Sequence, residues 1–137
     1  MVDYSNPNWV GEVIKATNGR KANVVYDSIA KDTFMGSLDC AAPFGTVALF
    51  GATSGPAPEI QSEILKKKGC LYLTRPSVFL HNATASLLQE NTSDVFSAIA
   101  SGKVKIKIGG KFSLEQIADA HRAAESRKVS GAIVIYP

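Results

Sequence analysis

Apolar residues along the chain alternate between helical spacing and short continuous runs, and turn residues separate these segments. A first helix is predicted between Asn6-Pro7-Asn8 and Asn18-Gly19, because Asn and Pro favour helix starts and Gly favours helix ends. Strands are predicted where β-branched and apolar residues run together. In chain order, the first part predicts a helix over 9–17, a strand over 23–28, a helix over 33–42 capped by Asp32, a strand over 45–50, a helix over 59–68 and a strand over 70–74.

Strands and helices that alternate at such short spacing form a parallel sheet with right-handed crossovers. The pattern changes in the second part of the chain, where a longer helix is predicted over 82–102. Val104, Ile106 and Ile108 then alternate with lysines, which predicts an edge strand with one solvent-exposed face.

The end of the chain predicts one more helix and one more strand. Ser113 to Gln116 matches a capping box, which starts a helix that ends near Arg127, and a last strand covers 132–136. The predicted fold class is therefore α/β, with a parallel sheet flanked by helices and a C-terminal strand-helix-strand tail over 103–137. We expect all 137 residues to form a single domain.

Residues 45–55 combine the pattern of a buried strand with a glycine-rich loop. The run from Gly45 to Phe50 is almost wholly apolar, which is typical of a strand covered on both faces. The loop that comes next, Gly51-Ala52-Thr53-Ser54-Gly55, contains only small residues. Ligands of open α/β sheets bind outside the carboxyl ends of the strands, where glycine lets the backbone approach them closely. The sequence therefore predicts a ligand site in this loop.

The composition is that of an ordinary globular protein, with 45% hydrophobic and 20% charged residues. No apolar segment is long enough to cross a membrane and the first residues lack the pattern of a leader, so we expect a cytoplasmic protein without a membrane partner. Cys40 and Cys70 lie in apolar contexts and are expected to be buried, reduced thiols. Tyr26 and Tyr72 lie inside predicted strands and are expected in the core.

Side chains that could act as acids, bases or nucleophiles are not grouped by the sequence. His81 and His121 have no serine or acid placed beside them, so structural or surface roles are the simpler interpretation. Ser54 lies one position too late for a nucleophile elbow. We therefore name no catalytic residue and no metal ligand.

A receiver-like domain is one non-enzymatic alternative. Asp27, then Thr53 or Ser54, then Arg75-Pro76 end three successive strands, as do the aspartate, hydroxyl and Lys-Pro of phosphoacceptor receiver domains. Arg replaces the usual Lys, and no acidic pair ends an earlier strand to hold magnesium. Both departures count against this alternative.

An RNA-binding module is the other alternative. The net charge is +3, and Lys103, Lys105 and Lys107 form a basic cluster that could contact phosphates. Solvated helix ends and strand faces explain the lysines more simply. We therefore do not expect nucleic acid as a partner.

Five segments, taken in order, resemble the NADPH-dependent quinone oxidoreductases of the zinc-free branch of the medium-chain dehydrogenase/reductase superfamily, the zeta-crystallin relatives. The resemblance covers the whole chain and implies a Rossmann-type fold, an enzyme that reduces a quinone with NADPH, and no metal. The segments are Val25-Tyr26-Asp27-Ser28, Ser37-Leu38-Asp39-Cys40, Phe50-Gly51-Ala52-Thr53-Ser54-Gly55, Leu73-Thr74-Arg75-Pro76-Ser77 and Ile99-Ala100-Ser101-Gly102-Lys103.

The resemblance also implies where the cofactor binds. Tyr4 matches a tyrosine that helps recognise the adenosine 2′-phosphate, although a surface aromatic near a terminus is an equal alternative. Phe50, Gly51 and Ala52 match the segment whose backbone faces the nicotinamide carboxamide, and Thr53 and Ser54 extend it. Exposed backbone groups at a strand end can indeed bind an amide.

Further cofactor contacts are implied by the same resemblance. Asp27 and Ser28 end the preceding strand near the expected path of a ribose, but a cap or turn role for Asp27 is equally consistent with the sequence. Arg127 lies where the chain of the family returns toward the cofactor.

The resemblance implies that part of the family's chain is absent. Members begin with a GroES-like catalytic domain and a glycine-rich turn for the pyrophosphate, and this sequence resembles the portion of a member that lies after both. We therefore expect a C-terminal portion that is inactive alone, with 103–137 returning to the catalytic domain. Homodimerisation is expected through the strand Cys70-Leu71-Tyr72-Leu73-Thr74, where family members join two sheets.

Overall fold

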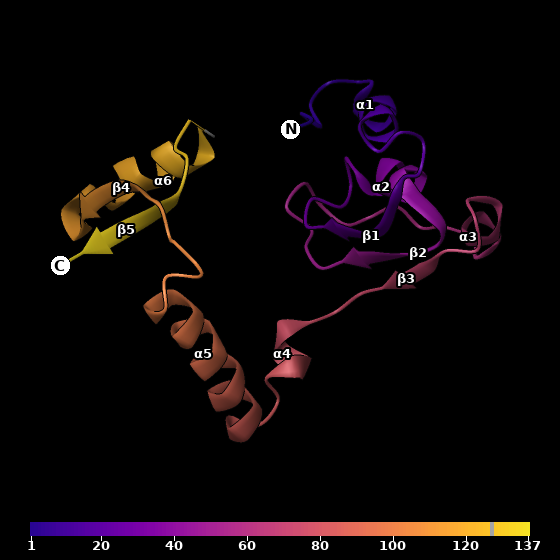
Figure 1. The fold of residues 1–137 in the computed structure, drawn as a ribbon. Coiled ribbons are helices and arrows are strands. Elements are labelled where there is room, and N and C mark those ends of the chain that lie inside the picture. The colour runs from indigo at the N-terminus through magenta and orange to yellow at the C-terminus, as the bar shows by residue number, and fades with distance from the viewer. Residues whose placement is uncertain (127) are drawn as a thin grey trace. The chain divides into compact units, whose positions relative to one another are not determined.

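The computed structural model describes residues 1–126 and 128–137 and divides them into two compact units, Met1–His81 and Asn82–Pro137 (Figure 1). Within the described residues, no helix is both long and apolar enough to span a membrane.

The first unit is a three-stranded parallel sheet with helices between the strands (Figure 1). The strand order is β1-β2-β3, and both neighbouring pairs run parallel, as the sequence predicts. Residues 45–49 lie in the central strand. In chain order the elements are α1 (Trp9–Ala16), β1 (Ala22–Asp27), α2 (Phe34–Cys40), β2 (Ala41–Leu49), α3 (Glu63–Lys67), β3 (Tyr72–Thr74) and α4 (Val78–His81).

The core of this unit lies on one face of the sheet. Phe34 and Leu38 of α2 pack against Val47 of β2, and these are the largest fully buried side chains. Full burial of each such side chain stabilises the fold by about 1.5–3 kcal/mol. Other members of the core and of the layer around it are Ala30, Ala41, Leu49, Leu71, Val25, Ala57, Ile60, Ile64 and Leu65.

The opposite face of the sheet is uncovered in this unit, which corrects the expectation that Tyr26 and Tyr72 are core residues. Their side chains are 75% and 63% exposed. Val24 pairs in register with Thr46, which pairs with Tyr72, so this face carries Val24, Tyr26 and Tyr72. Period-2 alternation identifies the faces of a strand, but it cannot say which face a neighbouring element covers.

Three further expectations for this unit are wrong. The N-cap of α2 is Thr33 rather than Asp32, and its hydroxyl donates to the buried Asp27 carboxylate instead of capping the helix. The helix expected over 59–68 is shorter, Glu63–Lys67. Cys40 is buried, and burial raises the pKa of its thiol, but Cys70 is exposed.

The second unit contains a long helix and a strand-helix-strand tail. Thr84 caps α5 by accepting a hydrogen bond from the N–H of Leu87 over 3.2 Å, and the predicted capping box of Ser113 and Gln116 is present. The strands β4 and β5 pair in parallel, as a strand-helix-strand connection requires. The elements are α5 (Ala85–Ala100), β4 (Ile108–Ser113), the short 3₁₀ helix η1 (Leu114–Gln116), α6 (Ile117–Glu125) and β5 (Ala132–Tyr136).

The edge strand expected from Val104 to Ile108 is wrong, because β4 begins only at Ile108. Pairing with β5 determines where the strand lies: Ala132, the first residue of β5, pairs with Ile108. Lys107 contributes a single carbonyl, which accepts a hydrogen bond from the N–H of Ala132 over 2.8 Å. Alternation of lysines with apolar residues thus indicates exposure here, but not strand pairing.

Candidate functional site

The candidate site is built by the two loops that leave the ends of β1 and β2. Asp27, the last residue of β1, pairs with Leu49, the last residue of β2, so both strands end at the same level. Ligands of parallel sheets bind at this edge. The loops therefore leave the sheet side by side at the place where the sequence predicts a ligand.

Main-chain hydrogen bonds join these loops on both sides of Gly51 and Ala52. The N–H of Phe50 donates to the Asp27 carbonyl over 2.9 Å, and that of Thr53 donates to the Ser28 carbonyl over 3.1 Å. The N–H of Ser54 donates to the Ile29 carbonyl over 3.0 Å. The second loop is thus attached to the first at three successive carbonyls.

Side-chain hydroxyls reinforce the connection. The Thr53 hydroxyl donates to the Ser28 carbonyl over 3.0 Å, and the Ser54 hydroxyl donates to the Ile29 carbonyl over 2.8 Å. The Ser54 oxygen also accepts from the N–H of Asp32 over 3.1 Å. Both hydroxyls therefore hold the two loops together. Their contact with a cofactor stays a prediction.

The Asp27 carboxylate lies inside the first loop and is only 4% exposed. Its Oδ1 accepts from the N–H groups of Ile29 and Ala30 over 2.9 and 3.0 Å. The Thr33 hydroxyl contacts both carboxylate oxygens over 2.9 Å, and the Ser37 hydroxyl donates to Oδ2 over 2.8 Å. This is the turn role that the sequence left open for Asp27.

The surroundings of Asp27 favour its charged form. Burial raises the pKa of the carboxyl, but hydrogen bonds from the Ala30 and Ile29 N–H groups and the Ser37 and Thr33 hydroxyls outweigh burial. The pKa therefore lies below its ordinary value of 3.8. Buried in this way, the carboxylate cannot meet a phosphodonor, which counts against the receiver-like alternative.

The Phe50–Ala52 segment keeps several backbone groups available for a ligand. Among the described residues, the N–H groups of Gly51 and Ala52 and the carbonyls of Phe50 and Gly51 have no main-chain partner. The Phe50 side chain is 52% exposed, and its ring meets that of Tyr26 edge-on at 6.4 Å. Unpaired donors and acceptors beside an exposed ring can bind a planar primary amide.

Glycine is required at position 51 by the distance between the loops. A Cβ at this position would lie 2.4 Å from the Ser28 carbonyl oxygen and 2.8 Å from its Cα. Only a residue without a side chain lets the loops come this close. The close approach of the two loops therefore depends on glycine at position 51, and contact of this segment with a nicotinamide stays a prediction.

Arg75 makes a contact at this site that the sequence pattern did not assign to it. Its Nη1 donates to the Leu49 carbonyl over 2.8 Å, so it holds the end of β2 from the side of β3. A basic residue directly after β3 was the available signal, because parallel strands end at one edge of a sheet.

Three predicted site residues remain, which are Ser28, Tyr4 and Arg127. Ser28 offers its carbonyl to the second loop rather than its side chain. Tyr4 lies before α1, is 47% exposed, and makes no hydrogen bond or ring contact with 50–54 in the described part of the chain. Arg127 lies outside the described residues.

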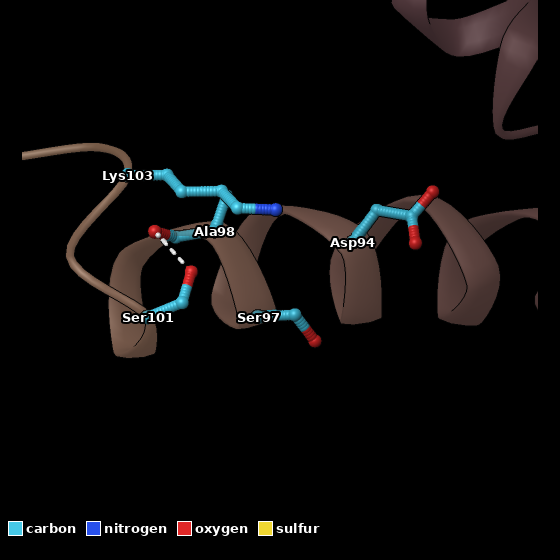
Figure 2. Close-up of a pocket in the computed structure, with 5 residues that line it drawn as sticks. All are labelled: Asp94, Ser97, Ala98, Ser101 and Lys103. Carbon is cyan, nitrogen blue, oxygen red and sulfur yellow. Dashed lines mark hydrogen bonds between the residues drawn. The ribbon is translucent and has the colours of Figure 1, made fainter.

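A hollow of about 380 Å³ lies on α5 and the turn at its C-terminal end (Figure 2). Asp94, Ser97, Ala98, Ser101 and Lys103 line it, and the Ser101 hydroxyl is bonded to the Ala98 carbonyl over 3.2 Å. These side chains are mostly exposed, so the hollow is open to solvent. Across residues 1–126 and 128–137, no group of three or more His, Cys, Asp and Glu side chains could hold a metal ion.

The parallel sheet and its glycine loop belong to a known class of protein. The family model described as "Zinc-binding dehydrogenase" matches residues 1–135, so the chain belongs to this family. It is 40% identical over 136 residues to a quinone oxidoreductase of Pseudomonas aeruginosa, covering 99% of this chain and 42% of that protein. It is 35% identical over 137 residues to a 2-haloacrylate reductase of a Burkholderia species, covering 99% of this chain and 41% of the relative.

A solved structure resembles the fold closely. The quinone oxidoreductase of Escherichia coli in complex with NADPH matches with a TM-score of 0.88 at 36% sequence identity. The match covers 98% of this chain and 42% of that chain. The present chain thus spans less than half the length of the relatives that it matches.

Proposed function

We propose that this chain forms the nicotinamide end of an NADPH site in a quinone oxidoreductase. NADPH, when bound, supplies the hydride, and the residues of this chain hold and orient the nicotinamide. The observation that carries the proposal is the pair of unbonded N–H groups of Gly51 and Ala52, within the described chain, beside the exposed ring of Phe50. The NADPH complex of the Escherichia coli relative supports this choice of cofactor.

The roles of the remaining site residues form part of the proposal. Tyr4 recognises the adenosine 2′-phosphate, Asp27 and Ser28 shape the ribose end of the site, and Thr53 and Ser54 extend the segment beneath the nicotinamide. Arg127 approaches the cofactor from the end of the chain.

A quinone is the proposed electron acceptor, because the relative from Pseudomonas aeruginosa is named for that substrate. A 2-haloacrylate reductase of similar identity favours a second candidate, an electron-poor carbon–carbon double bond. Either acceptor takes up a hydride, so both suit the same nicotinamide site.

The chain is proposed to represent the C-terminal portion of such an enzyme and to act in the cytoplasm. In this proposal 103–137 returns to the catalytic domain, and the rest continues the cofactor-binding domain. Two copies join through the strand over 70–74, where Tyr72 and Leu73 are exposed. The chain alone is proposed to be inactive, because it spans only 42% of the length of the quinone oxidoreductase from Pseudomonas aeruginosa.

Binding of nicotinamide mononucleotide to the ¹⁵N-labelled chain tests the proposal. We expect the amide signals of Gly51 and Ala52 to shift at millimolar ligand, because these N–H groups face the carboxamide. Adenosine 2′,5′-bisphosphate, which lacks the nicotinamide, should leave these signals in place and serves as the control. The absence of any shift over 50–54 with nicotinamide mononucleotide would contradict the proposal.

Activity is tested separately. The chain mixed with NADPH and 1,4-naphthoquinone should oxidise no cofactor above the rate without protein. Robust turnover would contradict the proposed inactivity of the chain alone, and it would leave the assignment of the nicotinamide site in place.

A further inference from the structure

We propose that Asp27 is a positioning residue for the nicotinamide-facing segment Phe50–Ala52, an inference that rests on the proposed function. Asp27 acts through the loop after β1, because its carboxylate bonds to that loop and to α2 rather than to the segment itself. The proposal depends on two consecutive layers of hydrogen bonds that lead from its carboxylate to Thr53 and Ser54, the residues that follow Ala52.

The first layer fixes the loop after β1. The carboxylate accepts two main-chain N–H groups, from Ile29 and Ala30, and two hydroxyls, from Thr33 and Ser37. Ala30 has a φ of +71°, a left-handed conformation that costs a non-glycine residue free energy. The bond from the Ala30 N–H to the carboxylate helps to hold this conformation in place.

The second layer of hydrogen bonds links the loop after β1 to the loop after β2. The carbonyls of Ser28 and Ile29, inside the turn that Asp27 closes, accept the N–H and hydroxyl groups of Thr53 and Ser54. Phe50 is bound to the main chain of Asp27 itself. Each end of the segment is therefore anchored to the turn that the carboxylate organises.

Gly51 and Ala52 lie between these anchors, and their N–H groups make no main-chain bonds in the described chain. The direction of these N–H groups is therefore set by the anchors on either side. A donor that is fixed before the ligand arrives binds with less loss of conformational entropy. Loss of the carboxylate should thus weaken nicotinamide binding even though Asp27 does not touch the ligand.

Amide hydrogen exchange separates this positioning role from a general loss of stability. In Asp27→Ala we expect the N–H groups of Thr53 and Ser54 to exchange faster by on the order of tenfold, the effect of one lost charge-assisted hydrogen bond. Val47 in the centre of β2 should change much less. Faster exchange at all three amides by one common factor would overturn the proposal, because it would show only global destabilisation.

Ligand binding provides the second measurement. Nicotinamide mononucleotide should bind Asp27→Ala on the order of tenfold more weakly than the native chain. Asp27→Asn keeps an acceptor for the backbone N–H groups and should restore most of the affinity. Equal affinity of the native chain and Asp27→Ala would overturn the positioning role.

Variants that remove one hydrogen-bond partner of the Asp27 carboxylate test the positioning role if Asp27→Ala does not fold. Thr33→Val and Ser37→Ala each remove one hydroxyl from the carboxylate and should loosen Thr53 and Ser54 in the same direction, by smaller factors. Asp39→Ala is the matched control, since this carboxylate lies on α2 but pairs with Lys68 away from the loop. Equal exchange in the partner variants and the control would overturn the proposal.

The exchange measurement needs no ligand, so the two proposals can fail separately. If the native chain binds no nicotinamide mononucleotide, the proposed function fails, and exchange at Thr53 and Ser54 still decides whether Asp27 orders the loop. If binding occurs and exchange does not depend on Asp27, only the positioning role fails.

Discussion

The N–H and the hydroxyl of Thr53 both donate to the main-chain carbonyl of Ser28, over 3.1 and 3.0 Å. Two donors from one residue therefore converge on one oxygen of the neighbouring loop. This relationship fixes the distance between the loops after β1 and β2 and leaves Gly51 and Ala52 between fixed points. Substitutions in the two loops and on the surfaces around them should therefore have distinct, measurable effects.

Ser54→Ala should lower the free energy of unfolding by about 1–2 kcal/mol, because its hydroxyl makes two hydrogen bonds between the loops. Urea unfolding monitored by the fluorescence of Trp9, the single tryptophan, measures this in the first unit. Ser93→Ala on the exposed part of α5 is the control, and it should change stability little. Equal stability of Ser54→Ala and the native chain would show that these bonds contribute nothing.

Gly51→Ala should separate the loops, because its Cβ would lie 2.4 Å from the Ser28 carbonyl oxygen. Overpacking of this kind costs about 1–3 kcal/mol. We also expect weaker binding of nicotinamide mononucleotide, measured by the amide shifts over 50–54. Ser93→Ala on the exposed surface of α5, outside the two loops, is the control and should keep the native affinity. Native affinity in Gly51→Ala would contradict the close approach of the loops as a requirement for binding.

The stability of the first unit should depend on the charge of Asp27 at acidic pH. Its pKa is lower in the folded chain than the ordinary 3.8, so the carboxylate stabilises the fold above that value. This contribution is lost as the pH falls through the lower, folded-state pKa. The difference in unfolding free energy between the native chain and Asp27→Asn should therefore be constant near neutral pH and shrink below about pH 4.

Urea unfolding at a series of pH values, with Trp9 fluorescence as the signal, measures this difference. The Asp39→Asn variant is the control, since its carboxylate is more exposed than that of Asp27. A difference between the native chain and Asp27→Asn that grows as the pH falls would contradict the assigned sign.

Tyr72→Lys or Leu73→Pro should convert a dimer into a monomer of 14.6 kDa in sedimentation. Both residues lie on the outer strand β3 and are exposed, and a lysine or proline there opposes pairing of edge strands. Met35→Lys on α2 changes another exposed apolar side chain and should leave the dimer intact. A native chain that sediments as a monomer, or variants of unchanged mass, would contradict the proposed interface.

Local patterns predicted much of this fold. The apolar run of β2, the strand over 132–136 and the capping box of Ser113 and Gln116 lie where the sequence placed them. These features depend on residues close in sequence. The strands β1, β2 and β3 run parallel because a helix connects each strand to the next, and such a crossover brings the next strand back in the same direction.

Features that depend on distant partners were not predictable in this way. The Thr33 hydroxyl at the start of α2 donates to Asp27, six residues earlier, a pairing that local sequence patterns do not reveal. Tyr26 is exposed because no element of the first unit covers its face of the sheet. For the candidate site, the sequence predicted a ligand at this loop, and that stays a prediction. It could not show that the hydroxyls of Thr53 and Ser54 donate to the neighbouring loop.

The exposed main chain at Gly51 and Ala52 has a consequence for how such a site can evolve. Peptide N–H groups are the same in every amino acid except proline, so substitutions at Ala52 can alter the space around a ligand without removing the N–H groups proposed to bind its amide. Reductases with different electron acceptors could thus differ in the side chains around this segment while they keep the same main-chain N–H groups. The stringent position is the glycine, since an added carbon there would collide with the neighbouring main chain.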